Sequence, residues 1–301
     1  MKTVFFGNHL YGHHALFVML EAGFVPDLVL ANVPREGERV WYPSVAELAA
    51  NHGIPIIKAN KVAGDTELRE RIRKISPDLF VVASFRNILD AELLAIPRRG
   101  AINLHMAPLP MYRGAHPENW AIINGEREMG YTVHFLDEGI DTGDIIDQAA
   151  VPILPEDNIL SLTFKLAHAA PSLLVDVLWR LKEDRITRTP QRESEASFYP
   201  PRKPSDGLID WSQGSKNIHN LVRALARPYP GAFTFLDGRK LTVWSLRANG
   251  GGTCNASPGT ILEISSQGIL VETGDKPVYL TEYDCEGDRL IQVFEGRVLG
   301  S

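Results

Sequence analysis

The sequence predicts an α/β protein with a doubly wound, mostly parallel sheet and a second, smaller domain rich in β-strands. Two observations carry this prediction. In the first half of the chain, short apolar runs alternate with segments of helical periodicity, which is typical of a parallel sheet covered on both faces. In the last third, short strand-like runs follow one another closely between turn residues, which indicates a small barrel or sandwich.

The first half is interpreted as alternating strands and helices. Strands are expected at four apolar runs, residues 4–7, 28–32, 54–58 and 79–84. Helices are expected where apolar residues recur at helical spacing, at 14–22, 45–52 and 66–75. Ligands of such a sheet bind at the carboxyl ends of its strands.

The middle of the chain contains two more strands, a long helix and a linker. The strands are expected at 130–135 and 145–151. The helix is expected at 159–183, interrupted near Pro171 because proline lacks a backbone N–H. Three prolines and a glycine then mark the linker. We therefore expect a first domain at 1–196, a linker at 197–206 and a second domain at 207–301.

The predicted second domain begins with a helix and continues with strands. The helix is expected at 216–226, before a proline-rich turn. The strands are expected at 232–236, 241–246, 259–263, 268–272 and 278–282.

Composition and charge narrow the class of protein. The 301 residues carry a formal charge of −6, whereas nucleic-acid binders usually show a basic excess. No apolar run is long enough for a membrane-spanning helix, and residues 1–7 resemble a first strand more than a signal peptide. Cys254 and Cys285 are the only cysteines, too few for a metal cage or a disulfide scaffold. We therefore expect a reduced, cytoplasmic protein with no membrane contact.

One strand places two polar side chains near its carboxyl end. Residues 102–105 have the pattern of a buried strand that Pro108 ends. Asn103 and His105 lie on the same face, because strand side chains alternate. An amide N–H can stabilise a developing oxyanion, and a neutral imidazole can hold or accept a proton near neutral pH. The alternative is that both are hydrogen-bonded polar groups of the core, and the residues alone leave both interpretations open.

An acidic loop follows between the strands at 130–135 and 145–151. Two glycines permit tight turns there, and four carboxylates crowd it: Asp137, Glu138, Asp141 and Asp144. Three interpretations compete: a solvated acidic loop, a calcium loop, or a carboxylate that orients His105. The spacing does not match EF-hand ligands, so calcium ranks lowest, and the other two interpretations stay open.

Other motifs that would indicate a different chemistry are absent or incomplete. The sequence GNHLYG, at residues 7–12, follows the first strand but does not match the GxGxxG dinucleotide fingerprint. The chain has no nucleophile elbow and no P-loop. Four histidines lack a matching acidic or cysteine set, so they are interpreted as surface or loop residues rather than metal ligands: His9, His13, His14 and His116.

Several stretches together resemble one known family. NLHMAPLPMYRG (103–114), NWAIINGE (119–126), GYTVHFLDEGIDTGDII (130–146) and FYPPRKPSDGLIDW (198–211) are similar to the 10-formyltetrahydrofolate-dependent formyltransferases. That family includes enzymes that act on methionyl-tRNA, glycinamide ribonucleotide and amino sugars. Over nearly the whole chain, and especially at 220–245, the sequence resembles the formyltransferase part of the bifunctional polymyxin-resistance enzyme. That part formylates UDP-4-amino-4-deoxy-L-arabinose.

The resemblance implies a fold, a reaction and a set of site residues. The fold would be Rossmann-like with an OB-like C-terminal barrel, and the reaction would move a formyl group from 10-formyltetrahydrofolate to a primary amine without a metal. The catalytic residues would be Asn103, His105 and Asp141. The folate would lie against two loops, at Phe85, Arg86, Asn87, Ile88, Leu89, Asp137, Gly139 and Ile140. The acceptor side would hold Tyr112, Arg113 and Asn119.

The identity of the acceptor amine is the finer question. This chain has Ala107 where the family often has serine, and Met106 adds bulk beside His105. Residues 207–301 carry nine basic and ten acidic side chains, a net charge of −1. That balance disfavours tRNA and favours a small nucleotide-linked amino sugar. The alternative functions are methionyl-tRNA formylation, hydrolysis of the formyl donor, formylation of a carrier-bound aminoacyl group and a non-catalytic sensor of folate or nucleotide sugar. The oligomeric state is also open, and a homo-oligomer is one option.

Overall fold

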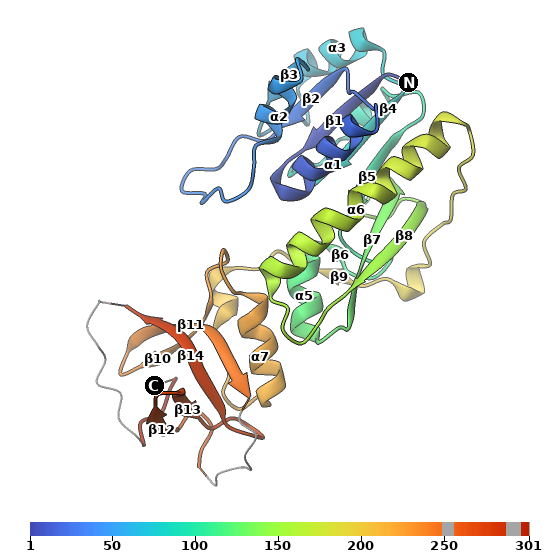
Figure 1. Cartoon of the computed structure of the whole chain (residues 1–301). Helices are drawn as coiled ribbons and strands as arrows, with labels where there is room; N and C mark the ends of the chain where they lie inside the picture. The colour runs from blue at the N-terminus through green and yellow to red at the C-terminus, as the bar shows by residue number, and fades with distance from the viewer. Residues whose placement is uncertain (249–255, 287–295, 301) are drawn as a thin grey trace. The chain divides into compact units, whose positions relative to one another are not determined.

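The computed structural model describes residues 1–248, 256–286 and 296–300, and the chain divides into two compact units (Figure 1). Unit 1 comprises Met1–Pro117, Glu128–Pro152 and Phe164–Tyr199, and unit 2 comprises Glu118–Arg127, Ile153–Thr163 and Pro200–Ser301. The last segment of unit 2 begins inside the linker that the sequence predicts at 197–206. The two short segments of unit 2 lie within the predicted first domain, which local sequence patterns do not reveal.

Unit 1 is built on a seven-stranded sheet with the order β3-β2-β1-β4-β5-β7-β8. The five strands from β3 to β5 run parallel, whereas β7 pairs antiparallel with both β5 and β8. The predicted mostly parallel sheet is therefore confirmed. The strands are β1 (Thr3–Gly7), β2 (Leu28–Ala31), β3 (Ile56–Lys58), β4 (Leu79–Ala83), β5 (Ala101–His105), β7 (Glu128–Phe135) and β8 (Ile145–Pro152).

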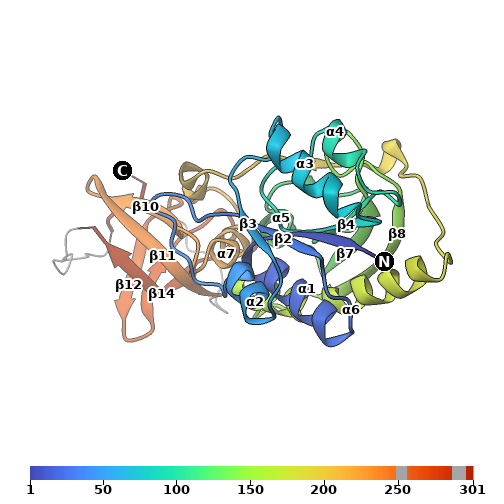
Figure 2. The ribbon, with the colours of Figure 1, turned by 90° about the horizontal axis from the view of Figure 1, so that it is seen from above.

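Helices cover both faces of this sheet. Figure 2 shows α1, α2 and α6 on one face and α3 and α4 on the other. Because strand side chains alternate, Phe6 and Phe80 point to the same face and pack in one buried cluster with Ile72 of α3. The helices are α1 (His9–Glu21), α2 (Val45–Asn51), α3 (Thr66–Ile75), α4 (Ala91–Leu94) and α6 (Ile159–Lys182).

Two helix predictions need correction. The helix α6 is not interrupted at Pro171 but runs through it. A proline removes one hydrogen bond and costs about 3 kcal/mol, and a long buried stripe that includes Leu166 and Leu174 offsets that cost. The helix α1 begins at His9 rather than residue 14, because Leu10 in its first turn is also buried.

Unit 2 carries an antiparallel five-stranded sheet with the order β10-β11-β14-β13-β12. Residues 296–300 hydrogen-bond to Ile261 of β12 through Gly296 and to Phe235 of β10 through Gly300, so they join the two edge strands. The predicted OB-like barrel is consistent with this closure. The strands are β10 (Ala232–Leu236), β11 (Arg239–Ala248), β12 (Ile261–Ser265), β13 (Gly268–Val271) and β14 (Val278–Cys285).

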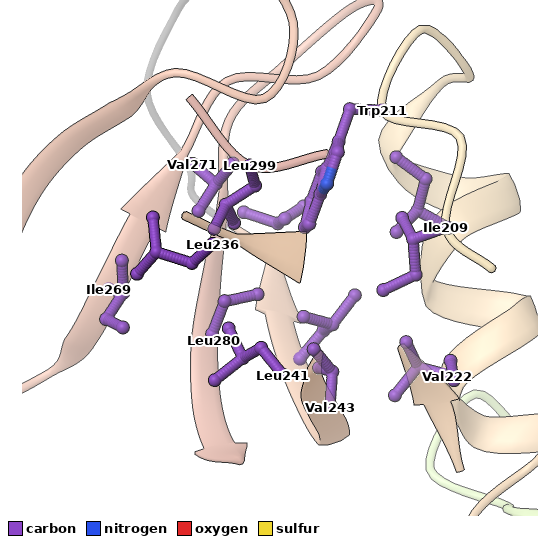
Figure 3. Packing of buried hydrophobic residues seen from close by; sticks show 14 of the residues in the cluster. Ile209, Trp211, Val222, Leu236, Leu241, Val243, Ile269, Val271, Leu280 and Leu299 are labelled. Atoms are coloured by element: carbon purple, nitrogen blue, oxygen red, sulfur yellow. The ribbon is translucent and has the colours of Figure 1, made fainter. Parts of the chain in front are cut away.

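The core of unit 2 lies between this sheet and the helix α7 (Ser215–Ala224). Figure 3 shows Val222 of α7 beside Val243 of β11, with Trp211 at one end of the cluster. The indole N–H of Trp211 donates to Thr234 Oγ1 at 3.0 Å, so its one polar atom is satisfied inside the core.

The remaining elements are short. The helix α5 covers Pro117–Asn124, and two 3₁₀ helices cover Glu193–Glu195 and Pro204–Gly207. A separate parallel pair joins β6 (Arg113–Gly114) to β9 (Phe198–Tyr199). None of the helices in the described ranges has the length and apolarity of a membrane span.

Candidate active site

Three polar side chains converge at the carboxyl end of β5. Asn103 and His105 belong to that strand, and Asp141 lies in the loop between β7 and β8. The Oδ1 atom of Asp141 is 3.8 Å from Nδ1 of His105, and these two side chains are only 13% and 12% exposed. This separation exceeds a direct hydrogen bond, so the carboxylate lies beside the imidazole without bonding to it directly. The structure thus brings together the three residues that the sequence singles out.

The carboxylate of Asp141 is held by the backbone around it. Its Oδ2 atom accepts a hydrogen bond from the backbone N–H of Gly114 at 3.0 Å. Asp141 itself has a φ of 55°, in the left-handed region that non-glycine residues rarely adopt. Two residues later, a Cβ at Gly143 would overlap the carbonyl oxygen of Phe135. The loop therefore follows a path that requires glycine at 143.

A fourth residue of the site, His134 on β7, was missed by the sequence reasoning. It lies directly opposite Asn103 in the β5–β7 register. Its Nε2 atom is 3.2 Å from Nδ2 of Asn103, and its Nδ1 atom is 2.8 Å from the carbonyl oxygen of Phe135. Because a carbonyl only accepts, Nδ1 carries the proton and Nε2 accepts from the Asn103 amide. His134 therefore fixes which way the Asn103 amide faces.

Burial keeps His134 neutral. The side chain is fully buried, and this desolvation, reinforced by the nearby His105, lowers its pKa from 6.5 to about 4. The carboxylate of Asp141 opposes the shift but does not cancel it. Only a register between β5 and β7 could have revealed this residue from the sequence, because the two are 31 positions apart.

His105 has one ring nitrogen aimed at no protein group. Its Nε2 atom is buried and has no hydrogen-bond partner among the described residues. Buried polar atoms are normally paired, so this atom is suited to bind a polar atom of a substrate. With its proton on Nε2, His105 would present a second N–H donor beside the Asn103 amide.

In the first loop expected to hold the folate, at residues 85–89, the arginine side chain is bonded to other groups of the protein. The Arg86 guanidinium pairs with Glu38 and donates to the hydroxyl of Tyr42. The hydrogen bond from Arg86 is the main reason why the pKa of Glu38 falls to about 2. The Arg86 backbone N–H donates to Asn32. This loop is therefore pinned to two other segments of unit 1.

The other residues of the two expected folate loops divide between core and surface. Phe85 and Leu89 pack in the hydrophobic core, whereas Ile88 and Ile140 are 71% and 51% exposed. Each loop thus presents one aliphatic side chain to solvent, as an apolar ring would require. The remaining residues contribute polar atoms. The Nδ2 atom of Asn87 is buried and has no hydrogen-bond partner in the described part of the chain. Asp137 accepts from Gly139 N and Thr142 Oγ1 in a tight turn.

The three residues expected on the acceptor side each make contacts within the protein. Tyr112 is buried and stacks on Tyr199, with ring centroids 4.8 Å apart. Arg113 is buried, and its guanidinium is bound to Gln191 and Glu193. Asn119 is fully buried within unit 2, where its Nδ2 donates to a backbone carbonyl.

Within the described ranges, no group of three or more histidine, cysteine, aspartate or glutamate side chains is placed to hold a metal ion. Cys285 is a free thiol, and Cys254 lies outside the described residues.

Comparison with known proteins places the chain in a family. Residues 38–178 match the family described as formyl transferase, and residues 202–295 match the formyl transferase C-terminal domain. A methionyl-tRNA formyltransferase of Desulforamulus reducens is 35% identical over 298 residues, which cover 98% of this chain and 93% of that protein. The chain therefore belongs to the formyltransferase family and is a one-carbon transferase.

Solved structures share the fold at lower identity. The N-formyltransferase of Helicobacter canadensis, in complex with folinic acid and dTDP-3-aminofucose, is 22% identical with a TM-score of 0.72, covering 94% of this chain and all of that one. The sugar 3N-formyltransferase WlaRD, with dTDP and 5-N-formyl-THF, is 20% identical with a TM-score of 0.70, covering 96% of this chain and 99% of that one.

Proposed function

We propose that the protein transfers the formyl group of 10-formyltetrahydrofolate to the primary amine of a nucleotide-linked amino sugar, such as UDP-4-amino-4-deoxy-L-arabinose. The observation that carries the reaction is the convergence of Asn103, His105 and Asp141, with the unpaired Nε2 of His105 among them.

The two N–H donors stabilise the charge that develops on the formyl oxygen. When the neutral amine of the acceptor attacks the formyl carbon, the carbonyl oxygen becomes an oxyanion. Nε2 of His105 and the remaining N–H of the Asn103 amide donate to it, while the other Asn103 N–H stays on His134. Removing one such donor typically lowers kcat by about 10²–10³-fold.

Asp141 takes part in moving the proton of the amine. Its Oδ1 atom lies 3.8 Å from Nδ1 of His105, while Nε2 of the same ring faces the oxyanion. The carboxylate accepts the proton that the attacking nitrogen loses, directly or through a water. As the C–N bond to the donor breaks, the proton held by Asp141 passes to the nitrogen of the departing tetrahydrofolate that carried the formyl group, directly or through a water, and the carboxylate is restored.

Charge supports a small acceptor over tRNA. Phosphate contacts dominate the affinity of nucleic-acid binding and need available cations. Three arginines of unit 2 are already committed within the unit: Arg227 and Arg297 pair with carboxylates, and Arg223 donates to backbone carbonyl oxygens. The sugar formyltransferases of similar fold were solved with dTDP or a dTDP-sugar, which agrees with a nucleotide-linked acceptor.

Methionyl-tRNA is the second candidate acceptor. It is favoured by one observation, the 35% identity to a methionyl-tRNA formyltransferase over almost the whole chain.

An acceptor panel distinguishes these candidates. The protein is incubated with 10-formyltetrahydrofolate and, separately, UDP- and dTDP-linked amino sugars or methionyl-tRNA, and tetrahydrofolate release and the mass of the acceptor are followed. Formylation of a nucleotide sugar with no product on methionyl-tRNA is the expected result. Turnover on methionyl-tRNA alone, or tetrahydrofolate release that needs no amine, would overturn the proposed acceptor.

A further inference from the structure

Gln191 joins two segments of the candidate active site that are far apart in the sequence. Its Nε2 atom donates to the carbonyl oxygens of Asp141 and Gly143, each at 2.8 Å. Its Oε1 atom accepts from Nε and Nη2 of Arg113, at 3.2 and 2.9 Å. Every polar atom of this amide is therefore used, with the loop on one side and β6 on the other.

The two bonds from Nε2 hold the backbone that carries Asp141. A non-glycine residue keeps a left-handed backbone only where the surrounding structure fixes it, and Asp141 has a φ of 55°. Gln191 binds the carbonyl of Asp141 itself and the carbonyl two residues later. One amide thus spans the turn at which the carboxylate leaves the loop.

The other end of the link is rigid. The Arg113 guanidinium is buried and also pairs with Glu193 at 2.9 Å. The next residue, Gly114, donates its N–H to the Asp141 carboxylate. Segment 113–114 therefore holds Asp141 in two ways. Gly114 binds the Asp141 side chain directly, and Arg113 binds the Asp141 backbone through Gln191.

We propose that Gln191 is a positioning residue for formyl transfer. It keeps the Asp141 carboxylate in position beside His105. This inference rests on the role given to Asp141 in the proposed function. It also gives Arg113 a purpose other than binding the acceptor, since Arg113 anchors the Oε1 side of the link.

The test is the Gln191→Glu variant. A glutamate keeps the size and an acceptor for Arg113, but it puts a carboxylate oxygen against two carbonyl oxygens where the amide donated. Displacement of a catalytic group by about 1 Å costs about 10²-fold, so we expect kcat to fall by about that factor. The loss should be larger in kcat than in the KM of the donor, because the displaced loop is also expected to contact the folate.

A matched control and a double variant separate positioning from general damage. Gln267 also accepts from an arginine, Arg247, so Gln267→Glu should keep wild-type kcat. In an Asp141→Asn background, Gln191→Glu should lower the residual rate by less than about two-fold, because both changes act on one group. A full further loss in that background, or a wild-type kcat for Gln191→Glu, would overturn the proposal.

A crystal structure of Gln191→Glu gives a readout that needs no acceptor. The expected result is a displaced Asp141 carboxylate that no longer accepts from Gly114. If Gln191→Glu fails to fold, Gln191→Met, which loses the donors without adding charge, takes its place in every measurement. A wrong acceptor shows as absence of turnover in the wild type, whereas an unmoved Asp141 in the variant contradicts the role of Gln191 alone.

Discussion

Acid should destabilise unit 1 through His134. This side chain is fully buried, and burial lowers its pKa from 6.5 to about 4. The unfolded chain therefore takes up the proton first as the pH falls. The stabilising contribution of neutral His134 is complete above the unfolded pKa of 6.5 and is lost as the pH falls towards 4.

The size of the effect follows from the two pKa values. A shift of this extent corresponds to about 3 kcal/mol when the loss is complete. Between about pH 7 and about pH 5, the free energy of unfolding of unit 1 should fall by about 2 kcal/mol on account of His134. The His134→Gln variant lacks this titration but keeps an amide that can accept from Asn103. Its free energy of unfolding should therefore not show the fall that His134 causes in the wild type.

Hydrogen exchange of the backbone amides of β7 measures this difference, because core strand amides exchange only when the whole unit opens. Exchange rates are corrected for the intrinsic effect of pH and converted to opening free energies for wild type and His134→Gln. The gap between the two proteins should change by about 2 kcal/mol over that pH range. Two parallel curves would refute the claim that a neutral, buried His134 supports the site.

Three further predictions follow from the same geometry. His105→Ala and Asp141→Asn should each remain folded by circular dichroism and lose at least about 10²-fold in kcat, and near-wild-type turnover in either would show that the site is misassigned. Gly143→Ala should lower kcat in a protein that stays folded, because an added Cβ overlaps the carbonyl oxygen of Phe135 and displaces the loop that carries Asp141; unchanged kinetics would contradict this. Trp211→Phe should destabilise unit 2 by about 1–3 kcal/mol in urea unfolding, because it leaves Thr234 without its buried donor, and an unchanged midpoint would argue against it.

Local patterns were enough to predict the strands of the two large sheets and the placement of two catalytic candidates, but not the short pair β6 and β9. A run such as Leu79–Ala83 is entirely buried, and burial of a short apolar run is encoded in the run itself. The period of two along β5 likewise puts Asn103 and His105 on one face. Glycines allow tight turns in the loop between β7 and β8, and these turns let Asp141 lie close to Asn103 and His105.

The rest of the site depends on contacts that no local pattern contains. His134 meets Asn103 only because β7 runs antiparallel beside β5, and Gln191 reaches Asp141 across 50 positions. Arg113 has a side chain suited to bind an anion, yet its partners in the structure are Gln191 and Glu193, far along the chain. The uninterrupted helix at Pro171 is a similar case, since tertiary packing overrides a local penalty.

The central claim is that Asn103, His105 and Asp141 surround one formyl carbonyl as it passes to an amine. A crystal structure with a stable 10-formyl folate analogue tests it most directly. We expect the formyl oxygen at about 3 Å from both Nδ2 of Asn103 and Nε2 of His105, with Asp141 on the side open to the amine. A formyl group bound away from these donors, with His105 Nε2 still unpaired, would contradict it.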